Sequence, residues 1–467
     1  MITKRNPIFR PFAWVGLATA LALATPFARA QDDQKQQHQV SEKVSDALQK
    51  LKPLEDAKNF TGMLSLIDGL LPQVKADSYD AAYLLNIEAR LYISLEKYPM
   101  AIDPWEKALA LSDRYHYFDD ATSQDIRKFT AQLLFQQATT TKNKAEQRAE
   151  VTKSQEYLKQ YLARTKKPEP DTQMLLAQIL YYTATADEKH IDQHALTEAR
   201  KVIEQSMDSA IHPREGLYML LIAIMQQQND YAHSAQLSEV FLKQWPTRKD
   251  IWPTLFATYY NLAGSAKQDS DEQRQYYLRA INTIDRAQKL GYMNTPRDNY
   301  NLFTLYVAAG FPSVACDMLY DGMKKGKIES TLNNWRTLGL YYEQVDRDLD
   351  AINALKDATK LFPNEGNLDL LIGQIYQQDD DTKNAHDYYA RAVKKGNLGE
   401  KPHLAYMYLA YTALELGDYD GALKAINEAV KTPDGAKDPQ VKSVREGIVQ
   451  TIADRNARLE AEKKKKK

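Results

Sequence analysis

The sequence predicts an all-α protein: a solenoid of about nine or ten helix–turn–helix pairs that forms a curved superhelix with a C-terminal capping helix. Three observations support this prediction. Residues of the same kind return after 34 and again after 37 residues, and a period of this length is typical of stacked repeats. Within each repeat the apolar residues follow helical spacing. No segment shows the alternating pattern of a β-strand.

The repeat is clearest in residues 332–436. We expect the small residues Gly339 and Ala351 to allow two helices to approach closely, and Pro363 to mark the end of the second helix because proline lacks an amide donor. The three copies contain Trp335, Leu338, Gly339, Tyr342, Ala351, Leu355, Ala358 and Pro363; Asp369, Ile372, Gly373, Tyr376, Ala385, Tyr389 and Ala392; and Tyr406, Leu409, Ala410, Ala413, Ala422, Ile426 and Ala429.

These residue types at these positions resemble the tetratricopeptide repeat (TPR). The resemblance implies a fold of stacked helix pairs, in which no pair can bury its apolar face alone and stacking creates a continuous core. It also implies a protein that binds other proteins and carries no catalysis in its repeats.

The first 30 residues are typical of a signal peptide: basic residues precede an apolar run from Phe12 to Ala24, and Ala28-Arg29-Ala30 resembles a cleavage site. We therefore expect export to the periplasm and a mature chain that begins at Gln31, with no stable membrane span. An uncleaved N-terminal anchor is the alternative, although the apolar run is shorter than the roughly 20 residues that a span needs. Cleavage changes the formal charge from −1 to about −5, which argues against a general nucleic-acid binder.

The remaining chain divides by the quality of the repeat. Residues 31–40 are polar and predicted to be disordered. Residues 41–212 contain helical repeats that are partly degenerate, above all in 121–212, and residues 213–436 form the TPR solenoid. Residues 437–462 are predicted to form the capping helix, and residues 463–467 a disordered tail because five consecutive lysines repel one another.

The sequence offers little chemistry. It contains no phosphate-binding loop, dinucleotide fingerprint or nucleophile elbow, so we expect no enzyme activity and no cofactor. His190 and His194 could lie on one helix face and bind a metal, but further ligands are missing. Cys316 is the only cysteine, and its apolar surroundings predict a buried thiol.

The TPR resemblance also implies where a partner would bind, because ligands of this family usually contact the inner helices. The corresponding residues could instead pack between neighbouring superhelical turns, and groove composition alone does not decide between the two. Tyrosines outside the signature positions, such as Tyr260, Tyr300 and Tyr411, could also line the groove. The candidate groove residues are Asn333, Arg336, Leu340, Glu343, Asn367, Leu370, Gln374, Gln377, Leu404, Met407, Tyr411 and Leu414.

A narrower resemblance covers roughly residues 296–450. The "KKGNL" linker before a repeat rich in Leu and Tyr, and "GKIES" before "NNWRTLG", resemble periplasmic TPR proteins that accompany TonB-type energy-transducing systems. This resemblance implies an accessory protein whose partners are TonB-type transport components. The alternative is a general envelope adaptor for secretion or cell-wall assembly, and a metal protein or enzyme that uses His190 and His194 is a third hypothesis.

Overall fold

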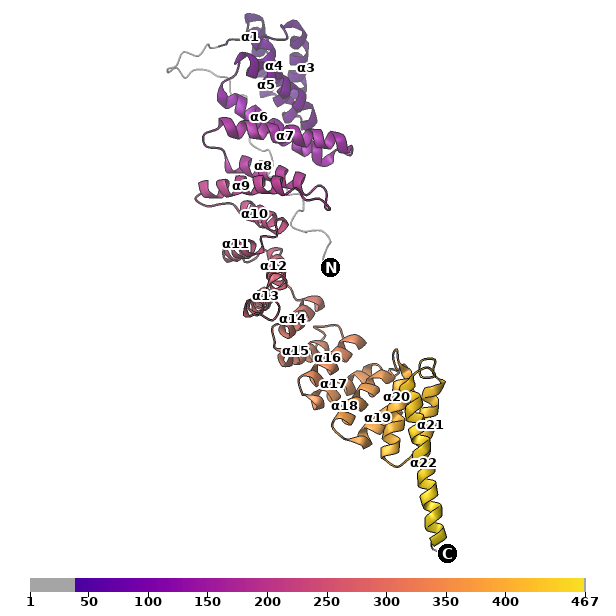
Figure 1. Cartoon of the computed structure of the whole chain (residues 1–467). Coiled ribbons are helices and arrows are strands. Elements are labelled where there is room, and N and C mark those ends of the chain that lie inside the picture. Colours follow the sequence, from indigo (N-terminus) through magenta and orange to yellow (C-terminus); the bar gives the residue numbers. More distant parts are fainter. Residues whose placement is uncertain (1–37, 466–467) are drawn as a thin grey trace. The chain divides into compact units, whose positions relative to one another are not determined.

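The structure, a computed structural model, describes residues 38–465, which form helices joined by short connections (Figure 1). The predicted signal peptide lies outside this range, as do residues 31–37. The chain divides into two compact units, one up to Pro246 and one from Thr247. This boundary lies one helix pair after the change that we expected at residue 213.

The first unit begins with three short helices, of which the third follows a turn at residues 57–59. Four helix pairs follow. Its helices are α1 (Glu42–Gln49), α2 (Leu51–Asp56), α3 (Phe60–Leu70), η1 (Leu71–Gln73), α4 (Tyr79–Ser94), η2 (Tyr98–Ala101), α5 (Ile102–Tyr115), α6 (Asp120–Thr140), α7 (Lys144–Arg164), α8 (Pro170–Ala184), α9 (Gln193–Ser209), α10 (Glu215–Gln227) and α11 (Tyr231–Gln244).

The second unit contains five further pairs and a long final helix. Its helices are α12 (Ile251–Ser265), α13 (Asp271–Lys289), α14 (Pro296–Ala308), α15 (Pro312–Lys324), α16 (Leu332–Gln344), α17 (Asp348–Leu361), α18 (Gly366–Gln378), α19 (Thr382–Lys395), α20 (Pro402–Glu415), α21 (Tyr419–Lys431) and α22 (Pro439–Lys465). Between residues 38 and 465 there are thus nine pairs and no strand, and the predicted fold class is confirmed.

The stretch 121–212, which looks degenerate in sequence, forms regular helix pairs. Helices α6 and α7 have 21 residues each, whereas α16 and α17 have 13 and 14. The residue spacing of the clear repeats therefore cannot be kept in the longer helices. The core is also partly polar. Arg127 is fully buried and pairs with Asp113, and the buried Glu150 accepts hydrogen bonds from Gln137 and Thr141. Longer helices and buried polar groups together obscure the repeat.

The clear repeats depend on small residues where the two helices of a pair meet. A Cβ atom on Gly339 would lie 2.9 Å from Cδ2 of Leu355, and one on Gly373 would lie 2.6 Å from Cε1 of Tyr389. Ala351 is fully buried in the same core. The predicted close approach at Gly339 and Ala351 is therefore present, and the large side chains across the pair fill the space that the small residues leave.

In several pairs a polar residue of the turn caps the second helix, as in α19 and α21. In the turn between α18 and α19, Asp380 adopts a left-handed conformation with φ 59°. The next residue, Asp381, caps α19 by accepting a hydrogen bond from the backbone amide of Asn384. Such caps satisfy amide groups that have no partner within the helix. The consecutive aspartates 379–381 therefore form the turn and begin α19.

The ends of the described chain differ in part from the expectation. Val441, Val444 and Ile448 of α22 pack against the last repeat, as expected of a capping helix. The helix continues through Lys465, into the tail that we expected to be disordered. At the other end, residues 38–40 have no regular structure, but the ring of His38 packs against Tyr79 and Tyr117.

A charged network joins neighbouring pairs in the second unit. The carboxylate of Asp357 in α17 accepts hydrogen bonds from Lys360 on its own helix, and from Lys324 and the hydroxyl of Tyr320 on α15. These donors, Lys360 first, hold the pKa of Asp357 well below its usual range.

None of the described helices combines the length and apolar character that crossing a bilayer requires.

Filling the space between paired helices should destabilise the fold. We expect Gly339→Leu and Ala351→Leu each to lower the free energy of unfolding by about 1–3 kcal/mol, because the larger side chains overpack the helix pair. Gly447→Leu is the control, since nothing lies within 4 Å of a Cβ atom at that helical glycine. Urea unfolding would measure all three, and unchanged stability in both test variants would contradict the packing described.

Removing the Asp357 carboxylate should cost stability in a pH-dependent way. We expect Asp357→Asn to lower the free energy of unfolding at pH 7 by about 1–2 kcal/mol, because its charge-assisted hydrogen bonds are lost. A carboxylate with a depressed pKa stabilises the fold above its unfolded pKa, about 3.9, and this contribution is lost as the pH falls through the folded value. The difference from the unsubstituted protein should therefore shrink below pH ~4. As a control, Asp387→Asn, at an exposed residue, should have little effect at any pH. A stability difference between Asp357→Asn and the unsubstituted protein that does not depend on pH would contradict the depressed pKa of Asp357.

Candidate interaction surface

The twelve predicted groove residues lie on the first helices of three successive pairs, α16, α18 and α20, and the structure divides them into three classes. Four are exposed: Asn333, Arg336, Leu340 and Tyr411. Six are half-buried: Glu343, Asn367, Gln374, Gln377, Leu404 and Leu414. Two are buried: Leu370 and Met407.

The two buried residues belong to the core. Leu370 is 6% exposed and packs in a cluster with Tyr389, Leu398 and Ala405. Met407 is 2% exposed and packs with residues of α21 and α22. Both side chains are apolar and lie where a neighbouring helix or connection covers the first helix, so they contribute to stability and are not available to a partner.

Several half-buried residues are already engaged in holding the repeats together. The Gln377 side-chain oxygen accepts a hydrogen bond of 2.6 Å from the hydroxyl of Tyr389. The Asn367 amide donates to the backbone carbonyl of Leu398 at 3.2 Å, and Glu343 accepts from Gln378 of the next pair at 2.9 Å. The four exposed residues, which we call the open positions, are the part of the predicted groove that packing leaves free.

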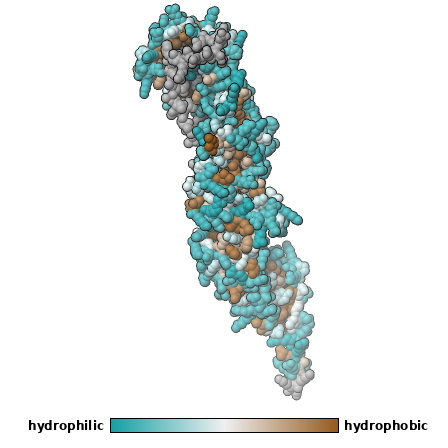
Figure 2. Space-filling view, turned by 90° about the vertical axis from the view of Figure 1, so that its left-hand side faces the viewer, coloured by the Kyte–Doolittle hydropathy of each residue, from teal (hydrophilic) through white to brown (hydrophobic). Residues whose placement is uncertain are grey.

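Apolar side chains contribute to this free surface. Leu340 is 53% exposed and Tyr411 is 36% exposed, and Tyr260 at the corresponding face of α12 is 49% exposed. Figure 2 shows scattered hydrophobic residues on a mainly hydrophilic face. Exposed aromatic and aliphatic side chains next to Asn and Arg make a surface of mixed character, which suits a polypeptide partner.

The signature tyrosines differ in their surroundings. Tyr342 is buried as predicted, with its hydroxyl donating to Asp317 and the guanidinium of Arg347 over its ring; burial raises its pKa. Tyr92 and Tyr376 are half-buried and pack against the core clusters of their repeats. Among the tyrosines outside the signature, Tyr300 is half-buried and contacts Phe303.

The candidate metal ligands do not come together. His190 lies in the connection before α9 and His194 within that helix, so the two are not on one helix face as the sequence suggested. The ring of His190 contacts Asp187 at 3.0 Å. In residues 38–465 no group of three or more His, Cys, Asp or Glu side chains is arranged to hold a metal ion.

Cys316 is buried as predicted, and burial raises its pKa to about 11, so its thiol is not poised to react.

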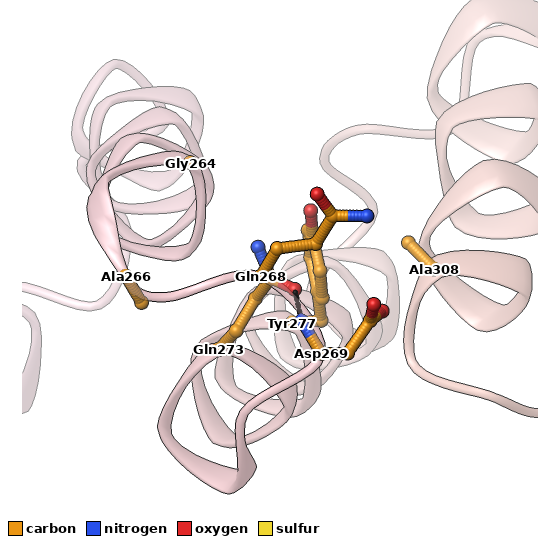
Figure 3. Close-up of a pocket in the computed structure, with 7 residues that line it drawn as sticks. All are labelled: Gly264, Ala266, Gln268, Asp269, Gln273, Tyr277 and Ala308. Carbon is orange, nitrogen blue, oxygen red and sulfur yellow. Dashed lines mark hydrogen bonds between the residues drawn. The ribbon is translucent and has the colours of Figure 1, made fainter.

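One pocket was not found by sequence reasoning. A cavity of about 430 Å³ lies beside the connection between α12 and α13, and Figure 3 shows its lining residues. The stretch "AGSAKQDSDEQRQ" lengthens this repeat in the sequence, although only residues 266–270 lie between the two helices. This extra length is the sequence signal for the pocket. The lining residues are Gly264, Ala266, Gln268, Asp269, Gln273, Tyr277 and Ala308.

Comparison with known proteins gives limited similarity. No protein-family model matches the chain. Anaphase-promoting complex subunit 3 of Schizosaccharomyces pombe is 35% identical over 96 residues, which make up 21% of this chain and only 14% of that protein.

Solved structures share helical repeats at low identity. A crystal structure of MamA protein is 18% identical, covering 38% of this chain and 90% of that one, with a TM-score of 0.28. A tetratricopeptide repeat protein from Parabacteroides merdae is 12% identical, covering 60% and 98%, with a TM-score of 0.31. A chain of the APC/C hetero-tetramer Cut9–Hcn1 is 15% identical, covering 86% and 76%, with a TM-score of 0.26.

The helix pairs in the clear repeats show how the small residues pack. Helices α16–α21 form successive pairs, and the small residues Gly339 and Gly373 lie against large side chains of the paired helix. This arrangement agrees with the resemblance to the tetratricopeptide repeat that the sequence shows in this part of the chain.

The division of the predicted groove into open and core residues can be tested by stability. We expect Leu370→Ala to lower the free energy of unfolding by about 2–5 kcal/mol, because it leaves a cavity in a packed cluster. Leu340→Ala, on the same kind of helix, should change it by less than about 0.5 kcal/mol. Urea unfolding of both variants would decide, and equal losses would contradict the division.

Proposed function

We propose that the protein is a periplasmic interaction scaffold that accompanies a TonB-type envelope transport system. The observation that carries the scaffold function is the set of open positions: Asn333, Arg336 and Leu340 on α16, and Tyr411 on α20, the first helices of two repeats. Stacking does not use these side chains, and exposed apolar residues beside amide and guanidinium groups favour a protein partner.

Export and the TonB-type association rest on the sequence. The basic and apolar N-terminal segment supports a signal peptide, and the "KKGNL" and "GKIES" linkers support the resemblance to repeat proteins of TonB-type systems. Under this proposal the partner is the periplasmic part of an energising complex of the inner membrane, or its outer-membrane client. The absence of an enzymatic activity stays a prediction.

Site-specific photo-crosslinking in the native host would test the proposal. A photoreactive residue at Arg336 or Tyr411 should crosslink TonB-like, proton-channel or outer-membrane receptor subunits, because both positions lie on the open inner helices. The mature protein in these adducts should begin at Gln31. Asn353, an exposed residue on the second helix α17, is the matched control and should give no such adduct.

The other outcomes separate the alternatives. Secretion or cell-wall proteins crosslinked through Arg336 and Tyr411 would keep the scaffold and replace the TonB-type association with a general envelope adaptor. The same adducts from Asn353 as from the open positions, or no adducts at all, would contradict the scaffold itself.

A further inference from the structure

The pocket beside α12 and α13 has its own architecture. Its walls are the end of α12, the connection that follows, α13 and Ala308 of α14. Figure 3 shows the side chains of Gln268, Asp269 and Tyr277 in the space between the connection and Ala308. Asp269 has a left-handed backbone with φ 57°, a conformation that costs most side chains energy but that Asp and Asn adopt comparatively easily.

The connection is braced, so the position of the Asp269 carboxylate is set by the backbone. The Asp269 amide donates to the side-chain oxygen of Gln273 at 3.0 Å, and the Gln273 side-chain nitrogen donates to the carbonyl of Ala263 at 2.9 Å. The carboxylate of Asp269 itself has no hydrogen-bond or ion-pair partner among the described residues. The same is true of the Gln268 amide and the Tyr277 hydroxyl. Gln268 and Asp269 are exposed and Tyr277 is half-buried, so three polar groups without a protein partner border one open pocket.

Aromatic rings of α12 lie next to the pocket-lining Tyr277. Tyr277 meets Tyr260 edge to face with ring centres 6.3 Å apart, and Tyr260 in turn meets Phe256 at 6.2 Å. Tyr260 stands eight residues after Trp252, as Glu343 of the predicted groove stands eight residues after Trp335. The pocket therefore adjoins the face of α12 that corresponds to the predicted groove face of α16, at the position of Glu343.

The surrounding rings already hold cations of this chain. Arg274 lies 4.9 Å from the ring centre of Phe311, Arg279 lies 5.8 Å from that of Tyr259, and Arg286 lies 5.0 Å from that of Trp252. Within the described residues no cation lies over Tyr260 or Tyr277. Lys267 is exposed on the same connection but forms no ion pair with Asp269.

We propose that this pocket, with Tyr260 at its edge, binds the ammonium or guanidinium group of a lysine or arginine side chain from a partner polypeptide. The carboxylate of Asp269 supplies the opposite charge, the rings of Tyr260 and Tyr277 supply faces that attract a cation, and the Gln268 oxygen accepts a hydrogen bond. This inference rests on the proposed scaffold function and names one chemical feature of its partner. Burial raises the pKa of Tyr277, so its ring stays uncharged near neutral pH.

Binding of short peptides to the mature full-length protein tests the inference. The probes are fluorescent, end-capped peptides that differ only in one central residue, Lys, Arg, norleucine or Glu, within uncharged flanks. We expect the Lys and Arg peptides to bind about tenfold more tightly than the norleucine peptide, a ratio equivalent to about 1.4 kcal/mol. Fluorescence anisotropy at low and physiological salt would measure this, and the preference should weaken as salt screens the ion pair.

Two variants and a matched control locate the effect. Asp269→Asn keeps a residue that tolerates the left-handed backbone, and Tyr277→Leu keeps apolar volume without the ring face. Both should bring the Lys peptide to the affinity of the norleucine peptide. Asp380→Asn changes an exposed aspartate with the same backbone conformation in another turn between paired helices, and it should leave the preference intact.

Several results would overturn the inference. Equal binding of all four peptides, equal effects of Asp269→Asn and Asp380→Asn, or an unchanged preference in Asp269→Asn would each do so. Competition by n-butylamine as effective as that by the Lys peptide would indicate a site for small amines instead of a polypeptide. If the crosslinks through Arg336 and Tyr411 persist in Asp269→Asn while the peptide preference is absent, the scaffold function stands and this inference fails.

Discussion

The rest of the structure depends on the close approach of the two helices in each repeat. At Gly339 and Gly373 there is no room for a Cβ atom, because Leu355 and Tyr389 of the paired helix occupy that space. Tyr389 cannot move aside easily, since its ring stacks on Tyr408 and its hydroxyl is bonded to Gln377. A small residue facing a large one therefore fixes the distance and the register of each pair, and the next pair packs on the surface so formed.

This packing decides which residues are free for function. Positions used in the pair or against the next pair, such as Leu370 and Met407, are unavailable although their spacing matches the groove. Positions that packing leaves open, such as Arg336 and Tyr411, differ chemically from repeat to repeat. The longer connection after α12 adds a pocket with a carboxylate and two tyrosine rings at its border, so the first repeat of the second unit adds a carboxylate and aromatic rings to the surface of the repeats.

The fold could be predicted because its determinants are local and periodic: small residues, turn residues and apolar spacing recur in the clear repeats. The pairs within 121–212 could not be aligned because α6 and α7 are longer and bury Arg127 and Glu150, which removes the apolar signal. Sequence spacing gives the face of a helix but not what covers it, so Leu370 was included in the predicted groove although it packs with Leu398 of the following connection. The pocket depends on the path of an irregular connection, which periodicity does not encode.

A double-mutant cycle on Gly373 and Tyr389 tests the central claim most directly, with the free energy of unfolding as the measured quantity. In the unsubstituted protein, Gly373→Ala should destabilise the fold, because the new methyl group meets the tyrosine ring. In the Tyr389→Ala background the same change should stabilise it by up to about 1 kcal/mol, because alanine favours the helix over glycine and the space is now open. An effect of the same sign and size in both backgrounds would contradict the account.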